Sequence, residues 1–172
     1  MTLRPASDRL IFLLDTVRRE GEHLIHTTQR LLPHPVDTTW VAGLEEDPDR
    51  AERLDAFVAR FSRMQDTLGD RLLPELLRQM LETPGSALDN LNRLEKLGLL
   101  ASVVDWVEAR NLRNRLVHEY MRDAEEFAGA VNRARELVPM LINTFNTINR
   151  YAREHFSGQG WPGELSGPSY PS

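Results

Sequence analysis

The sequence contains no cysteine, which excludes a disulfide framework and thiolate chemistry. This composition fits a reducing cytoplasm, so we expect a cytoplasmic protein. No apolar run approaches the ~20 residues that cross a membrane. The first residues, MTLRPASDRL, lack a signal-peptide core, and we expect no membrane partner. Positive charge is also scarce, because 21 Lys and Arg stand against 26 Asp and Glu. The net charge of −5 argues against broad electrostatic binding of long nucleic acid and favours a local, salt-sensitive contact through a small arginine cluster.

Apolar residues recur at three- and four-residue steps along most of the chain, which predicts an all-α fold. We expect an up-and-down bundle of four to five helices and no strand. Gly21 interrupts the first helix at a cost of ~1 kcal/mol. Residues 1–156 form the expected helical domain, and residues 157–172, rich in Gly, Pro and Ser, the expected disordered tail. The helices are predicted over 7–32, 49–73 with a kink or restart at Pro74, 86–97, 102–120 and 123–155, and a loop over 33–49.

The stretch R-N-R-L-V-H-E-Y, from Arg113 to Tyr120, ends the predicted helix that begins near Ser102. On a helical wheel at ~100° per residue, Arg113 lies in the middle of one apolar arc, and Asn114 and His118 lie together near its edge. A guanidinium on a dry face is costly unless it is paired or reaches water, so these polar groups require an explanation. The arc also holds Val103, Trp106, Val107, Ala109, Leu112, Leu116, Val117 and Tyr120.

These residue types allow chemistry on a phosphate ester. His118 is the candidate proton shuttle, because other polar groups share its face. Arg113 can hold a phosphate and stabilise charge on it, and Asn114, one turn before His118, can orient the imidazole. Tyr120 can donate a hydrogen bond to a ligand or accept a modification on its hydroxyl. The alternative is that Arg113 forms a structural pair with a buried carboxylate and that His118 is a satisfied core histidine.

Helix geometry limits how these groups can meet. Arg113 and His118 are ~140° apart on the wheel. They meet only if the arginine wraps round, if the helix bends at its end, or if a second subunit supplies half of the site. We expect no metal site, because His23 and His26 are three residues apart with no third ligand visible nearby.

The motif resembles that of the HEPN superfamily, and more closely that of HepT-like toxins from HEPN/minimal nucleotidyltransferase toxin–antitoxin pairs. The family motif is an arginine, four residues, a histidine, any residue and a tyrosine, here Arg113, His118 and Tyr120. The polar residue after the family arginine is Asn114. The lead-in from Glu95, E-K-L-G-L-L-A-S-V-V-D-W-V-E-A-R-N-L, is also typical of this family.

The resemblance implies a helical homodimer of the HEPN type, with a metal-independent endoribonuclease site in the cleft between subunits and RNA (tRNA or mRNA) as substrate. It makes His118 the general acid or base and Arg113 the group that stabilises the phosphorane. Asn114 and Arg110 are the candidate supporting, substrate-binding residues. No cofactor or metal is implied for the chain itself.

The resemblance also implies a partner, a small nucleotidyltransferase antitoxin that transfers AMP from ATP to the hydroxyl of Tyr120. Added phosphates at that position would crowd the cleft and repel RNA. One alternative is a HEPN subunit of a nucleotidyltransferase that binds nucleotide or RNA without cutting. Another is a plain helical interaction protein in which the motif is structural.

Overall fold

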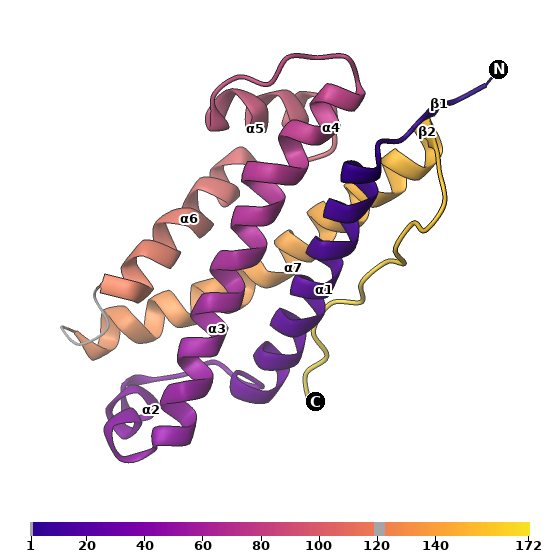
Figure 1. The fold of residues 1–172 in the computed structure, drawn as a ribbon. Coiled ribbons are helices and arrows are strands. Elements are labelled where there is room, and N and C mark those ends of the chain that lie inside the picture. The colour runs from indigo at the N-terminus through magenta and orange to yellow at the C-terminus, as the bar shows by residue number, and fades with distance from the viewer. Residues whose placement is uncertain (1, 119–122) are drawn as a thin grey trace.

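The computed structural model describes residues 2–118 and 123–172. Six helices of the described part pack into an all-α bundle, one more than the upper expectation. The long helices run alternately in opposite directions, as Figure 1 shows, which confirms the up-and-down arrangement. With α3 and its continuation α4 counted as one helix, the bounds are α1 (Asp8–Leu31), α2 (Thr38–Ala42), α3 (Pro48–Asp66) continuing into α4 (Leu73–Gln79), α5 (Ala87–Lys96), α6 (Val103–His118) and α7 (Ala124–His155).

The core lies between α1, α3, α6 and α7. Its largest fully buried side chains include Trp106 from α6, Phe57 and Phe61 from α3, and Phe145 from α7. The rings of Phe57 and Phe61 stack with their centroids 5.9 Å apart. Burial of one such side chain stabilises the fold by ~1.5–3 kcal/mol, so this core fixes where each helix lies. No helix among the described residues is long and apolar enough to cross a membrane.

Capping side chains stand at three of the predicted helix starts, at positions 7, 86 and 123. The hydroxyl of Ser7 accepts a hydrogen bond from the backbone N–H of Leu10 at 3.0 Å and starts α1. Ser86 and Asp89 exchange side chain–backbone hydrogen bonds as a capping box at α5. Asp123 accepts from two backbone N–H groups at the start of α7. Each cap is worth ~1 kcal/mol, so local sequence sets these boundaries.

The interruption predicted at Pro74 takes the form of a π-helical segment, Thr67–Leu72, between α3 and α4. The backbone N–H of Leu73 donates to the carbonyl of Leu68, five residues earlier. In a regular α-helix the ring of Pro74 would collide with the carbonyl of Asp70, and proline has no N–H to donate. The wider π turn relieves this clash and keeps α3 and α4 in one rod.

The prediction of a loop over residues 33–49 was wrong for residues 38–46, which are helical. The carboxylate of Asp37 accepts from the backbone N–H of Trp40 at 2.9 Å and caps the short helix α2. A 3-10 turn follows at Gly43–Glu46. Both elements are shorter than two helical turns, so they leave no apolar period for sequence reasoning to detect.

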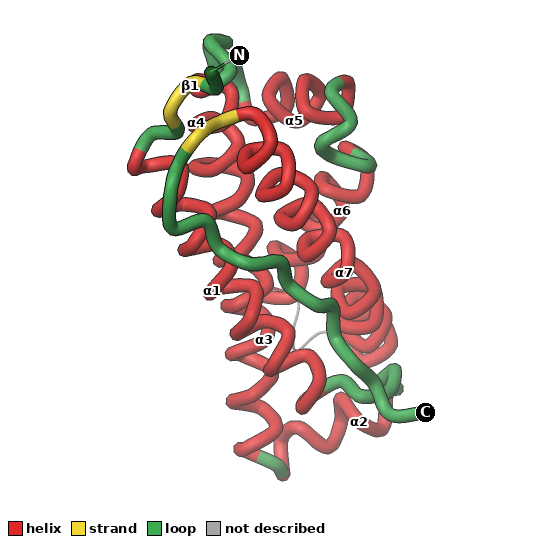
Figure 2. Tube along the Cα trace, turned by 90° about the vertical axis from the view of Figure 1, so that its right-hand side faces the viewer, coloured by secondary structure: helices red, strands yellow, loops and turns green. Residues whose placement is uncertain are grey.

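The amino-terminal residues meet the segment that follows α7 at one end of the bundle, where the expectation of no strand was wrong. β1 (Arg4–Pro5) pairs in parallel with β2 (Phe156–Ser157). Each strand has two residues, too few to produce an alternating pattern. The chain after β2 then runs back along the bundle, as Figure 2 shows.

Residues 158–172, the carboxyl-terminal strap, lie along α1 and α7, whereas the sequence led us to expect a disordered tail (Figure 2). Asn149 Nδ2 donates to the carbonyl of Pro162 at 2.9 Å. Asn146 exchanges two hydrogen bonds of 2.8 Å with the backbone of Leu165. Leu165 is buried. Contacts with α7 hold the strap in place, although it has no helix of its own.

Candidate functional site

Helix α6 carries the motif residues from Arg113 to His118 and packs against α3 and α7 (Figure 1). Arg113 lies at the border of the buried face and not in its middle, with about 30% of its side chain exposed. Val107 and Val117 are 39% and 58% exposed, so their predicted burial was wrong. The positions of the predicted arc that are buried are Val103, Trp106, Ala109, Leu112 and Leu116.

Two arginines of α6 pair with two aspartates of the α3–α4 rod. Arg113 Nη1 pairs with Oδ1 of Asp66, and Arg110 Nη2 lies 2.6 Å from Oδ1 of Asp70. The side chain of Asp66 is 44% exposed, so Arg113 has both a partner and access to water. Partly exposed pairs are worth ~0–1 kcal/mol. A guanidinium has five N–H donors, so one carboxylate oxygen leaves several for a ligand.

The π-helical segment shapes the contact with α6. A Cβ on Gly69 would lie 3.1 Å from Cζ2 of Trp106 and 3.5 Å from Nη2 of Arg110. Glycine inside a helix costs ~1 kcal/mol. Here it lets the fully buried indole and the guanidinium approach the rod closely, which positions Arg110 against Asp70.

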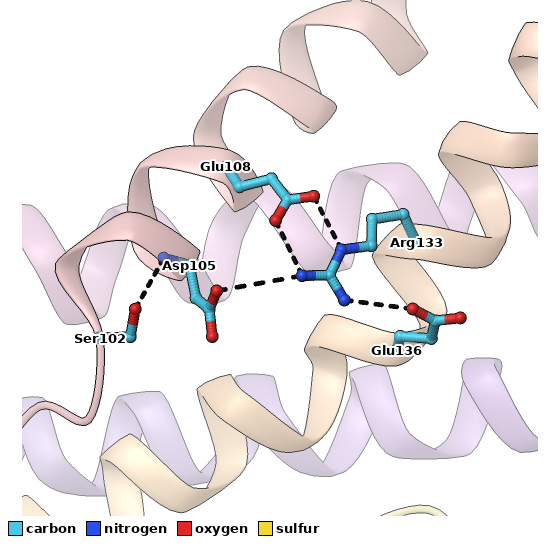
Figure 3. A network of polar contacts seen from close by, with 5 residues as sticks. All are labelled: Ser102, Asp105, Glu108, Arg133 and Glu136. Carbon is cyan, nitrogen blue, oxygen red and sulfur yellow. Dashed lines mark hydrogen bonds and ion pairs between the residues drawn. The ribbon is translucent and has the colours of Figure 1, made fainter.

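On its other side, α6 is fastened to α7 by Arg133 (Figure 3). Its Nε and Nη2 lie 2.7 and 2.8 Å from the two oxygens of Glu108, and its Nη1 lies 3.1 Å from Glu136. The hydroxyl of Ser102 caps α6 by accepting from the N–H of Asp105 at 3.1 Å. The hydrogen bonds from Arg133 lower the pKa of the Glu108 carboxyl, and the same bonds raise the pKa of Arg133. This bidentate contact between Arg133 and Glu108 fixes the orientation of α6 relative to α7.

A pocket of about 480 Å³ opens beside Arg113, between α3, the end of α6 and the start of α7. Its wall is mainly apolar and includes Val58, Leu116 and Phe127, with Asp55 as its carboxylate. A volume of this size can hold a nucleotide-sized group. The arginine at its edge gives it a phosphate-binding side chain.

The predicted site residues fall into three groups. Arg110 and Arg113 are brought together, one turn apart and both facing the α3–α4 rod. Asn114 is exposed. The side chain of His118 and the whole of Tyr120 lie outside the described residues, so their roles stay predictions.

Sequence reasoning missed Asp66 and Asp70. Asp66 and Asp70 are four residues apart, and Arg110 and Arg113 are three apart. Either spacing is about one helical turn, so the two pairs can face each other across antiparallel helices. That match was visible in the sequence, but it becomes a signal only once the two helices are known to be adjacent.

In residues 2–118 and 123–172, no group of three or more His, Asp or Glu side chains is arranged to hold a metal ion. Comparisons with protein families, curated proteins and solved structures gave no match. The functional conclusion therefore rests on the motif, the paired arginines and the pocket.

Proposed function

We propose that this chain is the toxin of a type VII-like HEPN/minimal nucleotidyltransferase pair, a metal-independent endoribonuclease that cleaves tRNA or mRNA. The observation that carries the proposal is the environment of Arg113. The motif arginine lies at the mouth of a pocket of about 480 Å³, fixed by Asp66 and still partly exposed. An arginine that is held in place and keeps free donors binds a phosphate at little entropic cost.

In the proposed reaction, His118 takes the proton from a ribose 2′-hydroxyl, and the 2′-oxygen attacks the adjacent phosphorus. Arg113 stabilises the added negative charge on the phosphorane. The bond from phosphorus to the 5′-oxygen then breaks, and that oxygen takes up a proton. The products are a 2′,3′-cyclic phosphate and a 5′-hydroxyl. Asn114 and Arg110 hold the substrate.

We propose that the site is completed in a homodimer. One arc of ~100° on α6 contains Asn114, the valines Val107 and Val117, and the position of His118. The two valines of this arc are 58% and 39% exposed, and Asn114 is exposed. An exposed apolar strip beside the motif favours coverage by a second copy, which then supplies the histidine opposite Arg113.

The proposed regulator is a minimal nucleotidyltransferase antitoxin that transfers AMP from ATP to Tyr120. The hydroxyl of Tyr120 is two residues beyond His118, so a nucleotide attached there adds negative charge next to the phosphate-binding groups. Intact mass after co-expression of the two proteins tests this step. An unmodified Tyr120 removes the adenylylation and leaves the nuclease proposal standing.

The proposed activity is tested by RNA cleavage with purified protein in EDTA. We expect the wild type to cut and His118→Ala to lose at least about a hundredfold in rate. His26→Ala is the matched control, because His26 is exposed on α1, away from the motif, and it should cut normally. Equal cleavage by wild type and His118→Ala would reject the proposal.

A second candidate is a HEPN subunit that binds nucleotide or RNA without cutting, since the pocket beside the partly exposed Arg113 is sufficient for phosphate binding. In that case the wild type binds RNA in EDTA without cleaving it, and His118→Ala weakens binding. A purely structural motif gives a third result, in which Arg113→Ala lowers the melting temperature and leaves binding unchanged.

A further inference from the structure

A second pocket, of about 400 Å³, lies between α1 and α3. Three arginines line it, Arg30 from α1 and Arg53 and Arg60 from α3. This pocket and the pocket beside Arg113 are lined by different α3 residues and share none. The two pockets therefore flank α3 as separate sites.

The guanidinium of Arg60 is positioned by hydrogen bonds to neutral groups and not by a carboxylate. Its Nη1 donates to the backbone carbonyl of His23 at 3.2 Å and to the hydroxyl of Thr27. Both acceptors are neutral, so they orient the guanidinium and leave its positive charge uncompensated. Arg30 and Arg53 likewise form no ion pair with any carboxylate in the described part of the chain.

An adjoining pocket of about 370 Å³ shares Arg30 and Arg53 with the first. It adds the half-buried indole of Trp40, a flat apolar surface. The guanidinium of Arg50 lies 5.4 Å from the centre of the Trp40 ring and pairs with Asp47 at 3.5 Å. Arg30 and Arg53 thus line both the pocket that contains Arg60 and the pocket that contains Trp40.

We propose that the two pockets form one binding site for a 5′-nucleoside monophosphate, either free or at the 5′ end of an RNA strand. The phosphate binds between Arg30, Arg53 and Arg60, and the base packs against Trp40. Asp49 and Glu52 also line the first pocket. Three arginines outnumber these two carboxylates, so the first pocket keeps a net positive charge for the phosphate.

Calorimetric titration tests the site with three probes: AMP, inorganic phosphate, and a short RNA with a 5′-phosphate. The titrations use the His118→Ala variant, so cleavage cannot remove the RNA and failure of the nuclease proposal does not affect the result. We expect AMP to bind about tenfold more tightly than inorganic phosphate because of stacking on Trp40. Trp40→Phe should reduce that difference. Tighter binding of the 5′-phosphorylated RNA than of AMP, when Arg30→Ala abolishes the difference, assigns the site to an RNA end, and equal binding assigns it to a free nucleotide.

Charge variants supply the second readout. Arg30→Ala and Arg53→Ala should each weaken AMP binding about tenfold. Glu52→Gln should tighten AMP binding, because the substitution removes a negative charge that repels the phosphate. Arg153→Ala is the matched control, since Arg153 is exposed on α7 and lines neither pocket. The site is overturned if neither AMP nor the RNA binds at millimolar concentration, or if Arg30→Ala and Arg53→Ala match the control.

Discussion

Gly21 lies in the middle of α1, where glycine normally weakens a helix. Its environment predicts that Gly21→Ala lowers the free energy of unfolding, whereas the same change in an exposed helix raises it. A Cβ built at Gly21 would lie 2.5 Å from Cδ1 of Leu165 and 3.1 Å from Cε of Met64. The strap therefore occupies the space that a side chain at Gly21 would take. In an open helix, Gly→Ala stabilises by ~1 kcal/mol. Forcing a methyl group into a packed core costs ~2 kcal/mol.

Gly21→Ala should therefore lower the free energy of unfolding by about 1 kcal/mol in the wild type. Leu165→Ala removes the nearest atom, so in that background Gly21→Ala should raise it by about 1 kcal/mol. The coupling energy is about 2 kcal/mol, large enough to measure. Urea unfolding of the four proteins, followed by far-UV circular dichroism, completes the cycle. Equal stabilisation by Gly21→Ala in both backgrounds would refute docking of the strap.

Three further outcomes are expected. Burial raises the pKa of Glu20 against a weaker, opposing hydrogen bond, so stability falls as pH rises through that pKa. Glu20→Gln should raise the melting temperature at neutral pH and lose its advantage in acid, as thermal unfolding across pH will show. Arg133→Met should cost at most ~1 kcal/mol in denaturant unfolding, since its pairs are partly exposed. Asp66→Asn should weaken RNA binding in anisotropy titrations, because Asp66 holds Arg113 in position, and tighter binding would show that the carboxylate competes with the phosphate instead.

The long helices were predictable because each has a local cause in the sequence. Leu10, Leu14 and Val17 repeat at helical spacing and are buried in α1. Ser7 and Ser86 cap helices at the expected positions. Periodicity and caps act within a few residues, so one sequence is enough to reveal them.

The features that sequence reasoning missed depend on contacts between distant residues. The strap is ordered by Asn146 and Asn149, which look like ordinary polar residues of α7 until Leu165 is placed beside them. Gly21 appeared to be a defect, although it makes room for Leu165. Asp66 became a site residue only when α3 was placed against α6.

The central claim is that two copies of the motif build one ribonuclease site, and mixing two inactive variants tests it most directly. Arg113→Ala and His118→Ala should each be inactive on RNA in EDTA. After unfolding and refolding together at equal amounts, half of the dimers are mixed and each carries one intact site, so about a quarter of wild-type cleavage should return. A refolded mixture as inactive as the separate variants would contradict the shared site.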